Sequence, residues 1–395
     1  MTNRVSVLIL GGRLAPNWLG VLAVRPDAVE FVVSSDTPGR YEEACQVLTQ
    51  LADLDVACEP KLVSAYSFVE TRNACLDIAQ GYPGAELIFD VTSAPKVMGF
   101  GAYEVARFLL QRAIVVDTAN GRIINLTQPR DELVGIQVPL EQYLACYGRR
   151  PVRTFSFERL SVSQEHAIAA ARSLVEAGPP AAEVMSRLRS WNQGKGKRTV
   201  PFRRTRPISP EELAVLRQLE AFGLISDLRQ QDDGRVSYML LNDADANYLN
   251  GMWLEVYVWD QARQCVNEKG TPFFDECDFS FEIPSNGARK EIDCGCMYRG
   301  QLIHCSCKTE SSPFHTAYLD ELRAVSALVG GHFTSRLFVT NALPPSEEEH
   351  GAYRDYQRFL AQAKDRETVV VTGHELRRIA ETLKREAARP TYARI

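Results

Sequence analysis

A regular alternation of apolar and polar side chains from Phe279 to Lys308 constrains the fold of this chain more than any other feature. Asn286–Gly287 and Arg299–Gly300 interrupt it where tight turns would lie, and Asn-Gly is the commonest two-residue hairpin turn. Because successive side chains of a strand point to opposite faces, the pattern predicts three antiparallel strands with one apolar face. That face would carry Phe279, Phe281, Ile283, Ile292, Cys294, Cys296, Ile303, Cys305 and Cys307.

The opposite face of these strands places a carboxylate beside an ammonium group. A two-residue loop at Arg299–Gly300 would set Asp293 opposite Ser306 and bring Lys308 to the same face. Upstream, Glu255 lies at the edge of an apolar stripe with helical spacing. Carboxylates in such a group bind a hard divalent cation that activates water, and a lysine can orient the nucleophile or neutralise a phosphate.

The run Trp253–Glu255, Glu291–Asp293, Cys305–Lys308 and Gly330–Gly331 resembles the PD-(D/E)xK nuclease domain of CRISPR-associated effector nucleases that cyclic oligoadenylates activate. The resemblance implies a metal-dependent endonuclease that uses Mn²⁺ or Mg²⁺. Its catalytic residues would be Glu255, Asp293 and Lys308.

One position departs from this family. The usual Glu-x-Lys appears here as Ser306–Lys308, so one carboxylate is missing. Some nucleases of the superfamily take it from the following helix, where Glu321 is available, and Glu310 is a nearer substitute. The resemblance thus implies Glu255, Asp293 and Glu321 as metal ligands. The alternative is an ordinary cross-strand ion pair between Asp293 and Lys308, which would contribute little at a surface.

Short apolar runs separated by helical patterns in the first 130 residues predict a parallel α/β sheet. The runs are Val5–Leu10, Val29–Val33, Val56–Val63, Leu87–Phe89 and Ala113–Val116. The fourth run leads into Thr92, Ser93, Ala94, Pro95 and Lys96 at the start of an apolar helix. Free N–H groups, the helix dipole, two hydroxyls and the lysine would all point at a phosphate.

No Walker sequence is present, and Gly99–Gly101 is too short for a dinucleotide fingerprint, so an ordinary NTP or NAD site is disfavoured. The segment Asp90–Met98 instead resembles the fourth-strand motif of CARF domains, although Pro95 removes one expected donor. The loops after the first and second strands stand where that fold contacts its cyclic nucleotide. The resemblance implies that a cyclic oligoadenylate, such as cyclic tetra-adenylate, contacts Gly11, Gly12, Asn17, Ser35, Asp36, Thr92, Ser93, Ala94 and Lys96. Alternatively, these are helix caps and turn residues.

The middle of the chain reads as a connector. Arg187–Arg206 holds eight basic residues and no acidic one, with Trp191 and Phe202 interleaved. It is either a flexible strap that follows a phosphate backbone or a basic linker. A capping box at Ser209–Glu212 and two strands joined at Asp232–Gly234 then predict a winged-helix-like element. Winged helices bind DNA in many proteins, but the acidic turn favours a connector.

The composition permits a globular protein of two or three domains. Its 395 residues are 45% hydrophobic, and a net charge of −5 argues against a protein that coats nucleic acid through bulk charge. No apolar run reaches the length of a membrane span, and the polar opening lacks the apolar core of a signal peptide. We therefore expect a cytoplasmic protein without membrane contact.

Ten cysteines in such a protein indicate a reducing compartment. Zinc at Cys294, Cys296, Cys305 and Cys307 is disfavoured because the strand pattern places all four side chains in the core. A buried Cys294–Cys305 disulfide is geometrically conceivable but disfavoured in the cytosol.

These observations predict an α/β chain with a Rossmann-like CARF sensor domain at 1–145, a helical and winged-helix-like connector at 146–248, and a PD-(D/E)xK nuclease-like domain at 249–395. The resemblance implies a homodimer, because a symmetric cyclic ligand would contact the loop Asp90–Lys96 of two copies of the chain. It also implies cleavage of DNA or RNA in type III CRISPR antiviral defence.

Three alternatives remain open at this point. The first is a ligand-responsive DNA-binding regulator with an inactive nuclease-like domain, favoured by Ser306. The second is an enzyme that opens the ring of its own signal, with Lys96 and Ser35 as the residues to test. The third is a sensor of a different nucleotide.

Overall fold

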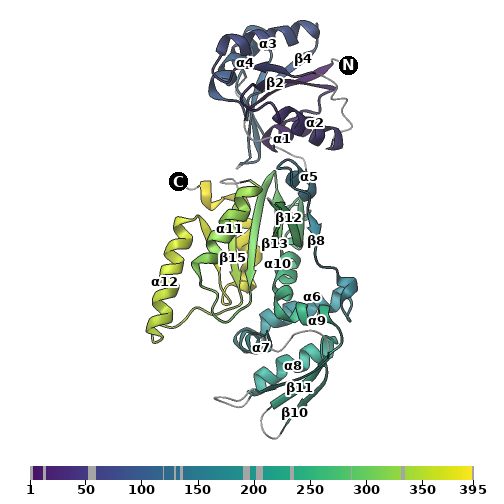
Figure 1. Ribbon diagram of the computed structural model, residues 1–395, viewed down its shortest axis with the longest axis vertical. Helices are drawn as coiled ribbons and strands as arrows, with labels where there is room; N and C mark the ends of the chain where they lie inside the picture. The colour runs from purple at the N-terminus through teal and green to yellow at the C-terminus, as the bar shows by residue number, and fades with distance from the viewer. Residues whose placement is uncertain are drawn as a thin grey trace. The chain divides into compact units, whose positions relative to one another are not determined.

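The structure, a computed structural model, describes residues 3–11, 15–51, 59–118, 120–128, 130–133, 137–189, 196–201, 208–231, 235–285, 287–330 and 334–393. The chain divides into two compact units. The first comprises Met1–Arg150 with the short segment Met297–Gln301, and the second comprises Pro151–Cys296 with Leu302–Ile395. Figure 1 labels the helices and strands of both units.

A seven-stranded sheet forms the first unit, in the order β3-β2-β1-β4-β5-β6-β7. The five strands β1 to β5 pair in parallel, which confirms the predicted parallel sheet, and β6 and β7 add antiparallel pairs. Part of the third predicted run lies outside the described residues. The strands are β1 (Arg4–Leu10), β2 (Ala28–Ser34), β3 (Lys61–Val63), β4 (Glu86–Asp90), β5 (Arg112–Asp117), β6 (Arg122–Asn125) and β7 (Arg130–Leu133).

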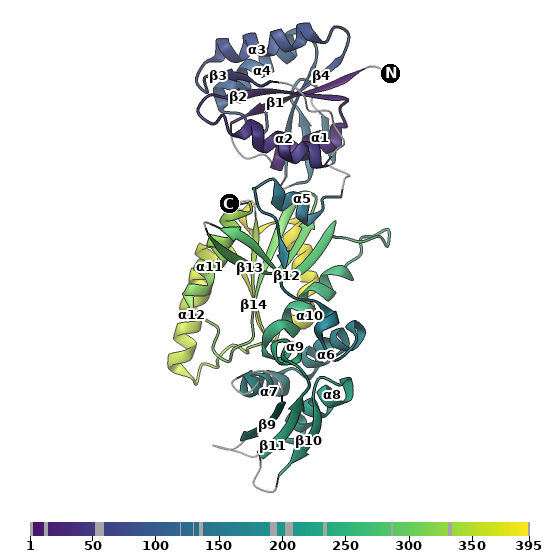
Figure 2. The ribbon, with the colours of Figure 1, turned by 45° about the vertical axis from the view of Figure 1, so that its right-hand side comes forward.

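Helices cover both faces of this sheet, with α3 and α4 on one face and α1 and α2 on the other (Figure 2). Val7, Ile9, Phe89 and Met98 are fully buried in the core beneath α3 and α4. Because β1 lies between β2 and β4, the strand order reverses there, and such sheets bind ligands at the carboxyl ends beside the reversal. The helices are α1 (Ala15–Val24), α2 (Arg40–Leu51), α3 (Phe68–Gly81), α4 (Lys96–Phe108) and α5 (Leu140–Ala145).

A six-stranded sheet in the order β16-β15-β14-β13-β12-β8 forms the core of the second unit. The three predicted strands are confirmed as β12, β13 and β14. Arg299 and Gly300 have φ of 49° and 81°, as a two-residue hairpin turn of type I′ requires. All nine side chains of the predicted apolar face are buried, none more than 8% exposed. The strands are β8 (Val152–Arg153), β12 (Glu276–Ser285), β13 (Ala288–Tyr298), β14 (Gln301–Lys308), β15 (Ser335–Thr340) and β16 (Thr368–Val371).

Helices pack on both faces of this second sheet. On the apolar face, Trp259 of α10 lies 4.8 Å from Phe279, measured between ring centroids. On the opposite face, His304 of β14 is hydrogen-bonded to Ser326 of α11 at 2.9 Å. Both faces of the hairpin are therefore buried. The helices are α10 (Trp253–Arg263), α11 (Thr316–Leu328), α12 (His350–Asp365) and α13 (Ile379–Ala388).

The connecting part of the second unit holds a small sheet in the order β10-β11-β9. The predicted capping box is confirmed, since the Ser209 and Glu212 side chains each bond the other residue's backbone N–H, and α8 ends at the left-handed Gly223. The elements are α6 (Gln164–Ala177), α7 (Pro179–Arg189), β9 (Gly196–Pro201), α8 (Pro210–Phe222), β10 (Ser226–Gln230), β11 (Arg235–Leu240) and α9 (Asp243–Asn247).

Part of the predicted basic strap is regular structure. Arg187 and Arg189 end α7, and Gly196–Pro201 pairs with β11 as β9. The prediction of a flexible segment is wrong for these residues, because their backbone groups are held by the sheet and the helix. Trp191 and Phe202 lie outside the described residues, as does the predicted turn at 232–234. No helix in the described part of the chain is long and apolar enough to cross a membrane.

Candidate metal and ligand sites

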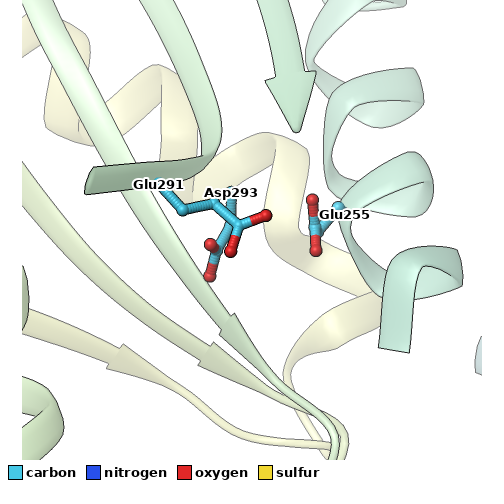
Figure 3. A group of neighbouring side chains, drawn as sticks. All are labelled: Glu255, Glu291 and Asp293. Carbon is cyan, nitrogen blue, oxygen red and sulfur yellow. The ribbon is translucent and has the colours of Figure 1, made fainter. Parts of the chain in front are cut away.

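Three carboxylates converge in the second unit: Glu255 from the first turn of α10, and Glu291 and Asp293 from β13 (Figure 3). One oxygen of each lies within 4.8 Å of one oxygen of the others. Glu255 and Asp293 are buried at 9% and 7% exposure, whereas Glu291 is exposed. The structure thus brings together two of the predicted site residues and adds one that the sequence analysis missed. The sequence signal for Glu291 is its spacing from Asp293, because residues two apart on a strand point to the same face.

The start of α10 is fixed against the end of β14. The Thr309 hydroxyl donates to the Asn250 carbonyl at 3.1 Å, just before the helix begins. A Cβ on Gly251 would lie only 3.1 Å from the same hydroxyl. Close approach at this glycine therefore places Glu255 within reach of β13.

Lys308 lies beside the carboxylates, as predicted. Its Nζ is 3.4 Å from Asp293 Oδ2, the oxygen that also accepts a 2.6 Å hydrogen bond from the Cys307 backbone N–H. The Ser306 hydroxyl donates to the same oxygen at 3.4 Å. Burial disfavours the charged form of Lys308, but Asp293 together with other nearby groups outweighs burial, so the lysine pKa is raised. The ammonium group therefore stays charged and faces the site.

Negative charge exceeds positive charge in this group. Burial, followed by repulsion from Asp293 and Glu291, raises the pKa of Glu255 well above its ordinary value. Burial and Asp293 likewise raise the pKa of Glu291. Glu255 Oε2 is buried without a hydrogen-bond partner. A set of carboxylate oxygens with one orphaned buried oxygen fits a hard divalent cation such as Mg²⁺ or Mn²⁺.

The sequence predicts two other carboxylates, Glu321 and Glu310, as candidates for this site. Within the described part of the chain, the group of three does not include Glu321, although this residue of α11 is near enough to raise the pKa values of Lys308 and Glu291. Glu310 accepts a hydrogen bond from Tyr318 and raises its pKa. Glu291 is therefore the nearest replacement for the carboxylate absent at Ser306, and a role for Glu321 stays a prediction.

In the first unit, the loops after β1 and β4 pack against each other at the strand-order reversal. A Cβ on Gly11 would lie 2.4 Å from Pro95 Cδ, so only glycine fits there. The Ser93 hydroxyl donates to the Ile9 carbonyl at 3.3 Å. Gly12 lies outside the described residues. The structure thus places the loops after β1 and β4 in contact with each other. The sequence predicts each of them as a ligand contact.

The side chains of Thr92 and Asn17 turn into the domain. The Thr92 hydroxyl donates to Asp90 and accepts from the Val116 N–H at 2.9 Å. Asn17 is 2% exposed and lies beside Asp90. The prediction that the Thr92 hydroxyl points at a phosphate is wrong, because that hydroxyl donates its hydrogen bond to the buried Asp90 carboxylate.

The remaining predicted contacts lie at the carboxyl edge of the sheet. Pro95 precedes α4 as its N-cap instead of standing in the first turn, and Lys96 begins the helix with its side chain exposed. The first N–H groups of a helix lack partners within it and favour an anion. Ser35 and Asp36 are exposed just beyond β2. The start of α4 therefore offers free N–H groups to an anion, whereas the Ser93 hydroxyl donates to Ile9 and the Ala94 N–H donates to Val91.

The sequence matches no protein-family model and no sequence among the curated proteins. Solved structures are similar over the whole chain. Can2 from Sulfobacillus thermosulfidooxidans, solved in complex with cyclic tetra-adenylate, is 19% identical with a TM-score of 0.72, and the match covers 98% of both chains. Protein VC1899 from Vibrio cholerae is 18% identical with a TM-score of 0.75, again over 98% of both chains.

A third structure, a type III CRISPR defence DNA nuclease activated by cyclic oligoadenylate, is 16% identical with a TM-score of 0.55. That match covers 88% of this chain but 47% of the other. These likenesses confirm the predicted α/β fold class and show that the chain shares the fold of these proteins.

Proposed function

We propose that this protein is a metal-dependent nuclease of CRISPR antiviral defence that cyclic tetra-adenylate switches on. The observation that carries the proposal is the group of Glu255, Glu291 and Asp293 beside Lys308. Carboxylates of this kind, with a charged lysine, suit phosphodiester hydrolysis. The fold shared with a protein solved with cyclic tetra-adenylate supports the choice of activator.

Glu255, Glu291 and Asp293 would hold Mn²⁺ or Mg²⁺, with Glu321 as a further candidate ligand from α11. When bound, the ion lowers the pKa of water and offsets the excess negative charge of the group. Lys308 neutralises charge that develops on the phosphate and orients the attacking water. Asp293 holds the lysine in place, since its Oδ2 lies 3.4 Å from Nζ.

The activator would bind at the carboxyl edge of the first unit. The start of α4 with Ser93, Ala94 and Lys96 takes a phosphate of the ring. Gly11 lets the first loop approach closely, and Ser35 with Asp36 lines the edge beyond β2.

A second copy of the chain would complete this ligand site. Tyr66, Val69 and Phe100 are 83%, 60% and 65% exposed, and they stand near the amino ends of α3 and α4. The two helices touch there, because a Cβ on Gly101 would lie 3.0 Å from the Phe68 carbonyl oxygen. Exposed apolar side chains gathered beside a ligand edge are typical of an interface, and a symmetric ligand suits a two-fold dimer.

DNA is the favoured substrate, with RNA as a second one to test. The alternative of a DNA-binding regulator with an inactive nuclease-like domain depended on the missing carboxylate at Ser306. Glu291 supplies a carboxylate in the same group, which favours an active site over a scaffold.

The test is cleavage of labelled single-stranded DNA, plasmid and RNA with Mn²⁺, with and without cyclic tetra-adenylate. We expect Lys308→Ala to lower the rate by at least about 100-fold while ligand binding is unchanged, since a positioned charge that stabilises the transition state contributes that much. Lys96→Ala should raise the ligand concentration needed for cleavage. Ligand binding without cutting by the wild type in any metal would establish the regulator instead.

Metal binding is tested separately by thermal unfolding. Glu255→Gln removes a buried carboxyl group that Asp293 and Glu291 repel when it is ionised, so the variant should melt higher than wild type without metal. Mn²⁺ should raise the melting temperature of wild type and have little effect on the variant. Glu268→Gln, at an exposed position, is the control. Equal Mn²⁺ responses in all three proteins would exclude Glu255 as a ligand.

A further inference from the structure

The second unit contains another pocket whose lining includes none of the three carboxylates. It has a volume of about 500 Å³, within the range of small-ligand sites. We call it the aromatic pocket, and it is lined by residues 153–159, Gln164, Trp259, Arg263 and residues 277–279. Trp259 follows Glu255 by one turn of α10, so these two residues lie about 6 Å apart along the helix axis.

Four aromatic rings form one wall of the aromatic pocket. Phe157 lies 5.9 Å from Trp259 and 5.7 Å from Phe279, and Phe155 lies 5.3 Å from Phe157, between ring centroids. Trp259 and Phe279 are each only 8% exposed, whereas Phe155 and Phe157 are half-buried. The latter two rings therefore present surface on which a flat group can stack.

Guanidinium groups lie around these rings. The Arg263 Cζ is 4.3 Å from the Trp259 ring centroid, and the arginine is exposed. Arg153 pairs with Asp278 at 3.0 Å. The lining holds three arginines, with Arg159 as the third, against two acidic residues, Glu158 and Asp278, so one positive charge is in excess. Rings beside arginines suit a planar base that carries a phosphate.

We propose that the aromatic pocket binds a nucleobase and its adjoining phosphate from an unpaired polynucleotide strand. The base stacks on Phe157, with the Phe155 ring at an angle of 82° to it alongside, and Arg159 and Arg263 contact the phosphate. This inference rests on the proposed nuclease function and adds a contact that holds the substrate strand on the unit that carries the carboxylates. The competing explanation is that the rings only anchor the segment after Arg150 to the sheet edge.

Binding of a labelled single-stranded DNA oligonucleotide to full-length Lys308→Ala, which is not expected to cut, tests the proposal by fluorescence anisotropy. Arg263→Gln should weaken binding about five- to ten-fold and reduce the salt dependence by about one phosphate contact. Phe157→Leu keeps apolar volume but loses the flat ring, so it should weaken binding about ten-fold, whereas Phe157→Tyr should not. Arg354→Gln, an exposed arginine of α12, is the matched control.

Melting temperatures identify any variant that fails to fold, and the surface change Arg263→Gln remains informative if Phe157→Leu does. Unchanged oligonucleotide affinity in folded Arg263→Gln and Phe157→Leu would overturn the proposal and leave a packing role. Competition with adenosine monophosphate separates the two sources of a base. If the pocket variants lose the free nucleotide but keep the oligonucleotide, the site is not for the strand. Cleavage by the wild type is measured in a separate assay. If the wild type does not cut, the proposed nuclease function fails, whereas unchanged oligonucleotide binding by the pocket variants overturns only this site.

Discussion

Burial controls the charge of single residues at both candidate sites. Asp90 is 1% exposed, and burial raises its pKa to about 6 although the Thr92 side chain and backbone hydrogen-bond to it. Its carboxylate accepts from the Thr92 backbone N–H at 2.9 Å. Asp90 therefore shapes the loop that leads to the proposed phosphate site. Burying its carboxyl group lowers the free energy of unfolding by an amount that depends on pH.

The sign of that dependence follows from linkage. Because the folded chain holds the Asp90 proton more tightly than the unfolded chain, stability is lost as pH rises from 3.8 to about 6. The loss is at most about 3 kcal/mol, since each pKa unit corresponds to about 1.4 kcal/mol.

Asp90→Asn should remove this loss, because the amide keeps an acceptor for Thr92 and does not ionise. Urea unfolding of wild type and variant between pH 4 and pH 7 should show the variant gaining stability relative to wild type as pH rises. Asp36→Asn, exposed at the same edge, is the control. A constant difference across this pH range would mean that Asp90 does not titrate there.

At the scale of elements, the approach of the loops after β1 and β4 decides the shape of the ligand edge. Gly11→Ala would place a Cβ 2.4 Å from Pro95 Cδ and force the loops apart. We expect cyclic tetra-adenylate to bind at least about ten-fold more weakly, a loss of about 1.4 kcal/mol, as measured by calorimetry.

The double variant Gly11→Ala with Pro95→Ala removes the colliding ring atoms and should recover part of the affinity. Gly81→Ala is the matched control, since a Cβ there meets nothing within 4 Å. If Gly11→Ala bound as wild type does, close packing of the two loops would not determine the ligand site.

At the scale of the whole molecule, the proposed dimer depends on the exposed apolar residues of α3 and α4. Phe100→Asp would bury a carboxylate against apolar neighbours in that interface, so we expect the dimer to weaken by at least about 100-fold. Sedimentation velocity measures the change. Phe108→Asp is the control, because Phe108 is 77% exposed but lies at the far end of α4. Equal dimerisation of the two variants would place the interface elsewhere.

Local pattern alone was enough to predict much of this protein. Alternation with a period of two specified the strands of the Phe279–Lys308 hairpin and its buried face, and apolar runs between helical patterns specified the parallel sheet. The capping box at Ser209 and the pairing of Asp293 with Lys308 could be predicted for the same reason. Each depends on residues close in sequence, whose backbone geometry is set by their spacing.

Only the tertiary structure decided the rest. Glu291 joined the carboxylate group because α10 approaches β13, and Thr92 turned inward because the buried Asp90 requires a hydrogen-bond donor. The strand β9 formed by pairing with β11, and the aromatic pocket assembled from three separate segments. These outcomes depend on packing and charge between distant parts of the chain, which no local spacing encodes.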